Sequence, residues 1–335
     1  MSRRVGPGHD RGVRAIQISS AGGPDVLTPV ELPDPQAGPG TLLVEVAAAG
    51  VNYIDTYQRE GIYPMALPYV PGLEGAGRVR AVGPDVTGFA VGDRVAWSEQ
   101  LGSYAELVAV SAAKAVPVPD ALPDDVAAAA LLQGMTAHAL ATDTHPVQPG
   151  EDVLVHAAAG GLGLLLTQLA TARGARVIGT VSTPEKEELA RAAGAADVIR
   201  YTEVDDVAAA VRELTGGAGV HVAYDSVGAT TFDASLAALR TRGLLVLCGA
   251  SSGPVPPLDP QRLNAAGSVY LTRPKLFDYI ATPEALAARA AAVYAAVADG
   301  ALDVRIGQRY ALADARRAHE DLQARRTTGK LLLIP

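Results

Sequence analysis

The chain has 335 residues, of which 49% are hydrophobic, so it can bury a large core and exceeds the usual length of one compact domain. A formal net charge of −8, without a stripe of Lys and Arg, argues against a nucleic-acid partner. Cys248 is the only cysteine, which excludes an intrachain disulfide and a thiolate cluster for zinc. No apolar stretch reaches the roughly 18 residues of a membrane span, so we expect a cytoplasmic protein.

The first third of the chain has the sequence pattern of a mostly β domain. Residues 1–12 are polar and glycine-rich, and we expect them to form a disordered lead-in. From Val13 to about Pro119, short apolar strands alternate with Gly-Pro and Pro-Asp turns, which predicts a compact, barrel-like fold. An alanine-rich helix is expected from Asp124 to Ala141, with Gly134 as a bend that leads into the next domain.

The middle of the chain alternates strands and helices, a pattern that predicts an α/β domain with a doubly wound parallel sheet. The expected strands lie at residues 152–155, 176–181, around 198, 220–224 and 244–248. After residue 271 the alternation ends. A long helix at 283–299, a strand, a helix with Arg316 and His319, and an apolar strand at 330–334 follow. We expect this last strand to rejoin the first domain, which gives a divided domain of residues 13–134 and 273–335 around an inserted domain of residues 135–272.

A glycine turn follows the first strand of the inserted domain. Residues 158–163, Ala-Ala-Gly-Gly-Leu-Gly, occupy the frame of the G-x-G-x-x-G dinucleotide fingerprint with alanine in the first glycine position. Gly160 would let backbone approach a diphosphate, and Gly163 would let the following helix pack on the strand. The helix N-terminus offers N–H groups to phosphate. A merely structural turn is the alternative, and the repeated strands and helices favour dinucleotide binding.

The end of the second strand decides between the two nicotinamide dinucleotides. An NAD site usually places an acidic residue there against the ribose 2′-OH, and this chain has the run Thr-Val-Ser-Thr-Pro-Glu-Lys at residues 180–186. Hydroxyl groups and the ammonium of Lys186 suit a 2′-phosphate, so NADPH is the predicted cofactor. Alternatively, Lys186 is a solvated helix residue, and Ser182 or Thr183 only caps the helix that begins at Pro184.

Five motifs spread along the chain extend this prediction beyond the cofactor. They are GGPDVL at residues 22–27, GVNYIDTYQREGIYP at 50–64, HAAAGGLG at 156–163, YDSVG at 224–228 and YLTRP at 270–274. With them the chain resembles, from Val13 onward, the zinc-free quinone oxidoreductases of the medium-chain dehydrogenase/reductase superfamily, the group of bacterial quinone reductase and zeta-crystallin. The resemblance implies a GroES-like catalytic domain divided around a Rossmann domain, with NADPH in the cleft. It also implies a homodimer joined by Rossmann sheet edges.

The resemblance is to the branch without a catalytic metal. Zinc-dependent relatives carry Gly-His-Glu and a cysteine-rich lobe, whereas this chain has Gly72-Leu73-Glu74 and no cysteine before Cys248. A leucine cannot coordinate zinc, and the six histidines lack the paired spacing of a tetrahedral site. We therefore expect no metal site, and an alcohol dehydrogenase mechanism is disfavoured.

The resemblance also assigns roles to individual residues. Those implied to face the nicotinamide or substrate, as catalytic residues, are Asn52, Tyr57, Tyr63 and Thr136. Those implied to hold the cofactor are Asn52, Tyr57, Thr136, Gly160, Gly161, Leu162, Gly163, Ser182, Lys186, Tyr201, Ser226 and Arg325.

Three of these assignments have competing interpretations. Asn52 could simply close a turn through its amide, and Tyr63 could be a core or turn residue rather than a stacking platform for a quinone. Arg326 beside Arg325 leaves the register of the C-terminal cation open. The chain also departs from the bacterial relative at Gln133, where that relative has a lysine, so substrate preference is expected to differ.

The predicted activity is the transfer of a hydride, or of single electrons, from NADPH to a small quinone. Asn52, Tyr57 or water would stabilise the oxyanion that develops on the quinone. The alternative within enzymes is NADPH-dependent reduction of an alkenal, an enone or an enoyl thioester. An alternative of another class is a non-catalytic NADPH- or RNA-binding protein, and the acidic balance disfavours RNA.

Overall fold

The computed structural model describes residues 12–335, and these form two compact units. The first unit comprises the described residues up to Ala128 together with Arg309–Leu322 and Leu331–Pro335, and the second comprises Ala129–Gln308 and Gln323–Lys330. The lead-in expected at residues 1–12 lies, apart from Gly12, outside the described residues. The chain therefore leaves the first unit and returns to it near the C-terminus.

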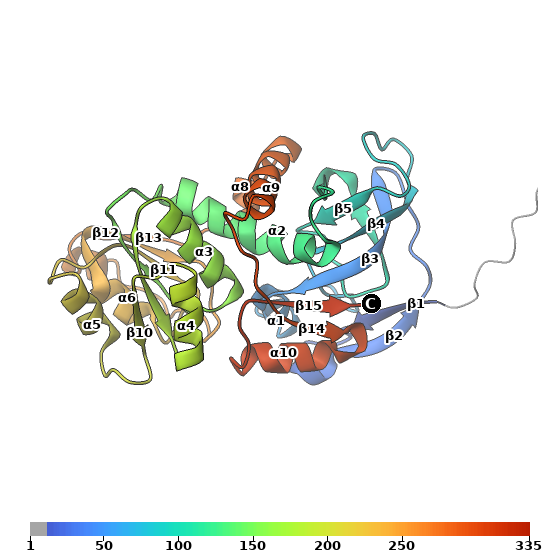
Figure 1. Cartoon of the computed structure of the whole chain (residues 1–335). Coiled ribbons are helices and arrows are strands. Elements are labelled where there is room, and N and C mark those ends of the chain that lie inside the picture. Colours follow the sequence, from blue (N-terminus) through green and yellow to red (C-terminus); the bar gives the residue numbers. More distant parts are fainter. Residues whose placement is uncertain (1–11) are drawn as a thin grey trace, which may run out of the picture. The chain divides into compact units, whose positions relative to one another are not determined.

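A seven-stranded sheet forms the first unit (Figure 1). Its path runs β14-β15-β3-β4-β5-β7, with β6 paired to β3, and β1 and β2 form a separate antiparallel pair. The C-terminal strand pairs antiparallel with β3, with Leu331 opposite Val51, so the expected return of the last strand is observed. The strands are β1 (Val13–Gln17), β2 (Thr28–Leu32), β3 (Thr41–Val51), β4 (Gly75–Val82), β5 (Arg94–Trp97), β6 (Leu107–Ser111), β7 (Ala115–Pro117), β14 (Ile306–Ala311) and β15 (Lys330–Ile334).

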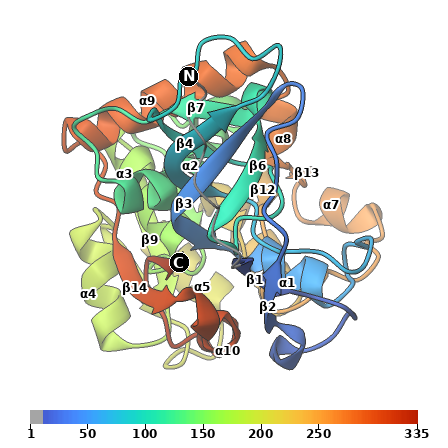
Figure 2. The ribbon, with the colours of Figure 1, turned by 90° about the vertical axis from the view of Figure 1, so that its right-hand side faces the viewer.

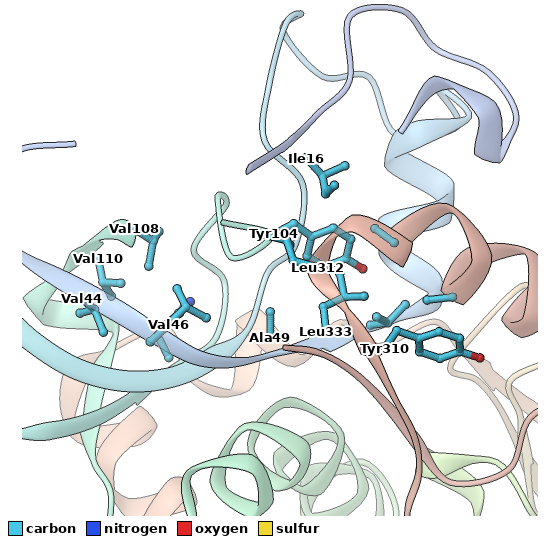
Figure 3. Packing of buried hydrophobic residues seen from close by; sticks show 14 of the residues in the cluster. Ile16, Val44, Val46, Ala49, Tyr104, Val108, Val110, Tyr310, Leu312 and Leu333 are labelled. Carbon is cyan, nitrogen blue, oxygen red and sulfur yellow. The ribbon is translucent and has the colours of Figure 1, made fainter. Parts of the chain in front are cut away.

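The core of the first unit follows from the alternation of apolar residues in these strands. Figure 2 shows β3 between β4 and β6, and in β6 the buried residues are Val108 and Val110, every second position. Val108 lies opposite Val44 of β3. Figure 3 shows this cluster continuing to Tyr104 and Leu333. Helices of this unit are α1 (Tyr53–Arg59) and α10 (Ala315–Gln323), with 3-10 turns at Pro24–Val26, Ala112–Lys114 and Leu312–Asp314.

The second unit contains a six-stranded parallel sheet in the order β10-β9-β8-β11-β12-β13. Numbered from its own first strand, this order is 3-2-1-4-5-6, that of the doubly wound dinucleotide fold. The strands are β8 (Asp152–Val155), β9 (Arg176–Val181), β10 (Asp197–Arg200), β11 (Val220–Asp225), β12 (Leu239–Leu247) and β13 (Tyr270–Thr272). The predicted sheet is therefore observed, and its ligand-binding edge lies at the carboxyl ends of β8 and its neighbours.

Nine helical segments follow the chain from residue 124 to 298. They are α2 (Asp124–Ala139), a π-helical turn (Leu140–Thr144), α3 (Gly161–Ala172), α4 (Pro184–Ala192), α5 (Val207–Leu214), α6 (Phe232–Ala238), α7 (Gln261–Ala265), α8 (Leu276–Tyr279) and α9 (Pro283–Ala298).

Two details differ from the sequence expectation. Helix α2 runs through Gly134 as regular α-helix, and a Cβ at Gly134 would lie 2.6 Å from Cγ1 of Val293 in α9. Close packing of two helices thus requires this glycine. Strand β12 begins at Leu239, five residues before the expected start at 244, because its first residue pairs with Val220 through an irregular register.

Candidate functional site

The glycine turn of the second unit has the geometry of a strand-to-helix phosphate loop. Strand β8 ends at Val155, and Gly160 is the N-cap of α3 with no side-chain cap. A Cβ at Gly163 would lie 2.3 Å from the carbonyl oxygen of Ala157, so glycine is required where the helix packs on the turn. A Cβ at Gly160 would meet only the same oxygen, at 3.2 Å. The protein itself therefore leaves room in front of Gly160, as a bound diphosphate needs.

Alanine in the first position of the fingerprint is accommodated by a glycine on the next strand. A Cβ at Gly179 in β9 would lie 2.9 Å from the Cβ of Ala158. The preceding residue, Ala157, has a left-handed backbone with φ +52°. The turn thus keeps its tight path at the cost of one non-glycine residue in a conformation that glycine prefers.

Gly161 and Leu162, also predicted to hold the cofactor, lie in the first turn of α3. Gly161 and Leu162 follow the N-cap directly, and no acidic residue occurs in this first turn. A Cβ at Gly161 would lie 2.1 Å from Oε1 of Gln133. The glutamine side chain is therefore packed against the phosphate turn, and its identity bears on the shape of the turn.

Three of the residues predicted to hold the 2′-phosphate meet beyond the end of β9. Nζ of Lys186 lies 2.7 Å from the carbonyl oxygen of Arg325 and donates a longer hydrogen bond of 3.4 Å to Oγ of Ser182. Arg325 has a left-handed backbone, with φ +57°, which turns its carbonyl at this point. The ammonium is therefore held at the position where a 2′-phosphate is expected.

Of the two residues considered as caps of α4, Thr183 is the one that caps it. Oγ1 of Thr183, the N-cap of α4, accepts a hydrogen bond of 3.3 Å from the backbone N–H of Lys186. Capping thus uses Thr183 and leaves Ser182 for the ammonium of Lys186. Tyr201 follows β10, donates its backbone N–H to the carbonyl of Val181 at 3.0 Å, and has a side chain that is 37% exposed. Its ring lies at the surface beside the end of β9.

Ser226 follows β11 at the same edge of the sheet. Its carbonyl oxygen accepts from the backbone N–H of Ser251 at 3.3 Å, and a Cβ at Gly249 would lie 2.3 Å from that oxygen. Two loops are thus packed backbone to backbone. Thr136, in α2, donates its hydroxyl to the carbonyl of Leu132 at 2.7 Å, so its Oγ1 lies against its own helix.

In the first unit, Asn52 begins α1 and is 5% exposed. Its Nδ2 donates to Oε1 of Glu74 at 2.7 Å, and its backbone N–H donates to Oδ2 of Asp55 at 2.8 Å. A Cβ at Gly50 would lie 2.1 Å from the same Glu74 oxygen, so glycine there makes room for the pair. Glu74 of the Gly-Leu-Glu run thus holds the side chain of Asn52.

Tyr57 and Tyr63 form an aromatic pair beside this helix. Their ring centroids are 5.7 Å apart in an edge-to-face arrangement, a favourable geometry. Tyr57 is 8% exposed and Tyr63 is 41% exposed. Tyr63 is therefore a surface residue whose ring is supported by a buried one, and it is not part of the core.

A buried polar chain behind α1 was not predicted from the sequence. The Tyr104 hydroxyl lies 2.9 Å from Oδ2 of Asp55 and 3.1 Å from Nε2 of His319, and Nη1 of Arg59 lies 2.9 Å from Nδ1 of His319. Burial of the ring, and to a smaller extent the positive charge of Arg59, lower the pKa of His319 to about 3. The imidazole is thus neutral and accepts at Nδ1. The Asn-x-x-Asp spacing at 52–55 could have indicated the cap, but no local pattern connects it with His319.

Among residues 12–335, no group of three or more His, Cys, Asp or Glu side chains is placed to hold a metal ion. Leu73, in the position of the zinc-binding histidine, is buried at 5% exposure. In the same range, no helix is long and apolar enough to cross a bilayer.

Comparison with known proteins identifies the family. Residues 38–120 match the alcohol dehydrogenase GroES-like domain, and residues 161–282 match the zinc-binding dehydrogenase family. A quinone oxidoreductase of Pseudomonas aeruginosa is 46% identical over 96% of this chain and 99% of its own. The chain belongs to the quinone oxidoreductase family of the medium-chain dehydrogenase/reductase superfamily. The predicted family, and the fold of a Rossmann sheet with a GroES-like domain, are confirmed.

Two further members of this superfamily bear on cofactor and substrate. The structure of a mycobacterial protein in complex with NADPH is 54% identical, with a TM-score of 0.94 over 97% of this chain and all of its own. A 2-haloacrylate reductase of Burkholderia is 41% identical over 96% of this chain and 99% of its own. Relatives of similar identity to this chain are thus named for a quinone in one case and for an activated alkene in the other.

Proposed function

We propose that this protein is an NADPH-dependent quinone oxidoreductase that works without zinc. The observation that carries the proposal is the ammonium of Lys186, held by Ser182 and the Arg325 carbonyl beyond the end of β9. No carboxylate stands at residues 180–184, where an NAD site would place one. The family relationship and the NADPH complex of the mycobacterial relative support the same conclusion.

The cofactor is held by residues of the second unit. Gly160 leaves space for the diphosphate, and the N-terminus of α3 presents N–H groups to it. Ser182, Lys186, Tyr201 and the cation of Arg325 or Arg326 bind the 2′-phosphate, while Ser226 and Leu162 line the approach at the same sheet edge. When bound, NADPH supplies the hydride.

The residues that we propose to face the nicotinamide or the substrate are Asn52, Tyr57, Tyr63 and Thr136. Glu74 holds the side-chain amide of Asn52, and Asp55 holds its backbone N–H, so the side-chain amide is oriented before any substrate arrives. Tyr57 is buried and packed on Tyr63, whose exposed ring offers a flat face to a planar quinone. Asn52 and Tyr57 would donate hydrogen bonds to the quinone oxygen as negative charge develops there, and solvent would supply the protons.

The substrate assignment is tested by stopped-flow measurement of NADPH oxidation. The acceptors are 1,4-benzoquinone, crotonyl-CoA, an alkenal and 2-haloacrylate, the last because a 41% identical relative is named for it. We expect the quinone to give the largest kcat/KM. Faster turnover of any alkene would replace the quinone assignment by activated-alkene reduction, and binding of NADPH without any turnover would favour a non-catalytic role.

We further propose that the protein is cytoplasmic, forms a homodimer and has no nucleic-acid partner. In each subunit, residues 13–134 and 273–335 would form the catalytic domain and residues 135–272 the cofactor domain. Strand β13 is the last strand of the Rossmann sheet, and Tyr270 on it is 56% exposed. Pairing of two such edges would cover that ring. Light scattering after gel filtration tests this, with Tyr270→Asp expected to shift the mass toward the monomer.

A further inference from the structure

Four polar side chains lie buried beneath the dinucleotide turn of the second unit. His156 follows β8 directly, Thr180 is in β9, Asp225 ends β11, and Ser235 is in α6; each is at most 3% exposed. Side chains of this polarity are buried at a cost unless they are hydrogen-bonded, so their bonds have to be complete. His156, Thr180 and Asp225 lie at the carboxyl ends of three neighbouring strands, and Ser235 comes from α6.

The four groups form one chain of hydrogen bonds with a defined direction. Oγ of Ser235 lies 2.6 Å from Oδ2 of Asp225, so the single hydroxyl proton of Ser235 is given to the carboxylate. Ser235 must then accept from Nε2 of His156, 2.9 Å away. Nδ1 of His156 is therefore the acceptor for the Thr180 hydroxyl, also at 2.9 Å. Burial lowers the pKa of His156, which keeps the ring in this neutral form.

Asp225 at the end of this chain also shapes the loop that carries Ser226. Its Oδ1 accepts the backbone N–H groups of Val227 at 2.8 Å and Gly228 at 2.9 Å, and the hydroxyl of Thr231 donates to both carboxylate oxygens at 2.8 Å. The carboxylate is thus saturated by donors. Ser235 thus links His156 to the carboxylate that holds this loop.

We propose that His156 and Asp225 are positioning residues for the dinucleotide. Through Thr180 and Ser235 they lock the glycine turn after β8 to the end of β9 and to the loop after β11, so that the N–H groups facing the diphosphate are fixed before it binds. The inference rests on the proposed NADPH site. Fixing these three segments beforehand lowers the ordering cost of binding, which is the general origin of affinity from preorganisation.

The expected effect is selective for the diphosphate. His156→Leu removes the imidazole that joins Thr180 to Ser235, while Ser235 keeps its bond to Asp225. Ser235→Ala breaks the same chain with a smaller change of volume. Each variant should weaken NADPH and NADH alike by about ten-fold, because part of the ordering of these three segments would then occur on binding. ADP-ribose should weaken by the same factor. Adenosine 2′-monophosphate, which lacks the diphosphate, should bind as it does to the parent.

A matched control exists at the opposite end of the same two strands. Nδ1 of His221 accepts from the backbone N–H of Asp152 at 3.1 Å, at the amino ends of β11 and β8. His221→Leu therefore removes a histidine hydrogen bond of the same strand pair, away from the turn. It should leave all four affinities unchanged, even if its melting temperature falls.

Isothermal titration of the full-length protein, far below each melting temperature, separates the outcomes. Failure of the parent to bind NADPH would end the proposed function. If the parent binds and both His156→Leu and Ser235→Ala retain its affinity for ADP-ribose, the positioning role is wrong. Equal weakening of adenosine 2′-monophosphate and ADP-ribose would also overturn it, because the damage would then be general. Should His156→Leu fail to fold, Ser235→Ala decides the question.

Discussion

Replacement of Lys186 by alanine should separate the two nicotinamide cofactors. The ammonium sits 2.7 Å from the Arg325 carbonyl and 3.4 Å from Ser182, so it is already placed before a phosphate arrives. A hydrogen bond to a charged group contributes about 1.5–3 kcal/mol, and partial exposure of this lysine favours the lower limit. With about 1.4 kcal/mol for each factor of ten, Kd for NADPH should rise about ten-fold.

The assay is fluorescence titration of Lys186→Ala with NADPH and with NADH. NADH has no 2′-phosphate, so its Kd should stay within about two-fold of the parent value. Lys275→Ala is the control, because Lys275 is a 68% exposed lysine of the same unit whose ammonium pairs with Asp278 at 3.3 Å. It should change neither affinity. Equal losses for NADPH and NADH in Lys186→Ala would refute the phosphate role and leave only a structural contact with the C-terminal segment.

Three further predictions concern the framework of the two units. Gly179→Ala should lower the free energy of unfolding by about 1–3 kcal/mol, because the new Cβ would lie 2.9 Å from the Cβ of Ala158. In a double-mutant cycle measured by urea unfolding, Ala158→Gly should restore part of this loss, and additive effects of the two substitutions would argue against the contact. Tyr104→Phe removes the hydroxyl that bridges Asp55 and His319, which keep their bonds to Asn52 and Arg59, and should lower the free energy of unfolding by about 1–3 kcal/mol in the same assay. A parent-like unfolding midpoint would show that this hydroxyl is dispensable. Folding lowers the pKa of His319 from 6.5 to about 3, so between these pH values the unfolded chain binds a proton that the folded chain does not, and the free energy of unfolding should decrease as the pH falls. His319→Gln should make the melting temperature less dependent on pH in this range, and an unchanged slope would contradict the role of His319.

Local patterns predicted the parts of this protein that depend on neighbouring residues. The strand, glycine turn and helix at 152–174 follow from apolar residues and glycines close together in the sequence, and the parallel sheet follows from the alternation of strands with helices. The absence of a carboxylate at 180–184 is also a local property. These features were enough for the sheet, the phosphate turn and the choice of cofactor.

Contacts between distant segments could not be predicted in the same way. Arg59 and His319 are 260 positions apart, and His156 and Ser235 are 79 positions apart. A buried histidine looks the same in the sequence whether it binds a metal, relays a proton or holds a loop. Only the fold shows that Thr183 caps α4 and leaves Ser182 to Lys186, and that Gly134 is needed for Val293.

A crystal structure of the protein with NADPH tests the account most directly. We predict density for the 2′-phosphate within hydrogen-bond distance of Nζ of Lys186 and Oγ of Ser182, and the diphosphate in front of Gly160. A 2′-phosphate directed into solvent, or a dinucleotide bound away from the turn at residues 158–163, would contradict the account.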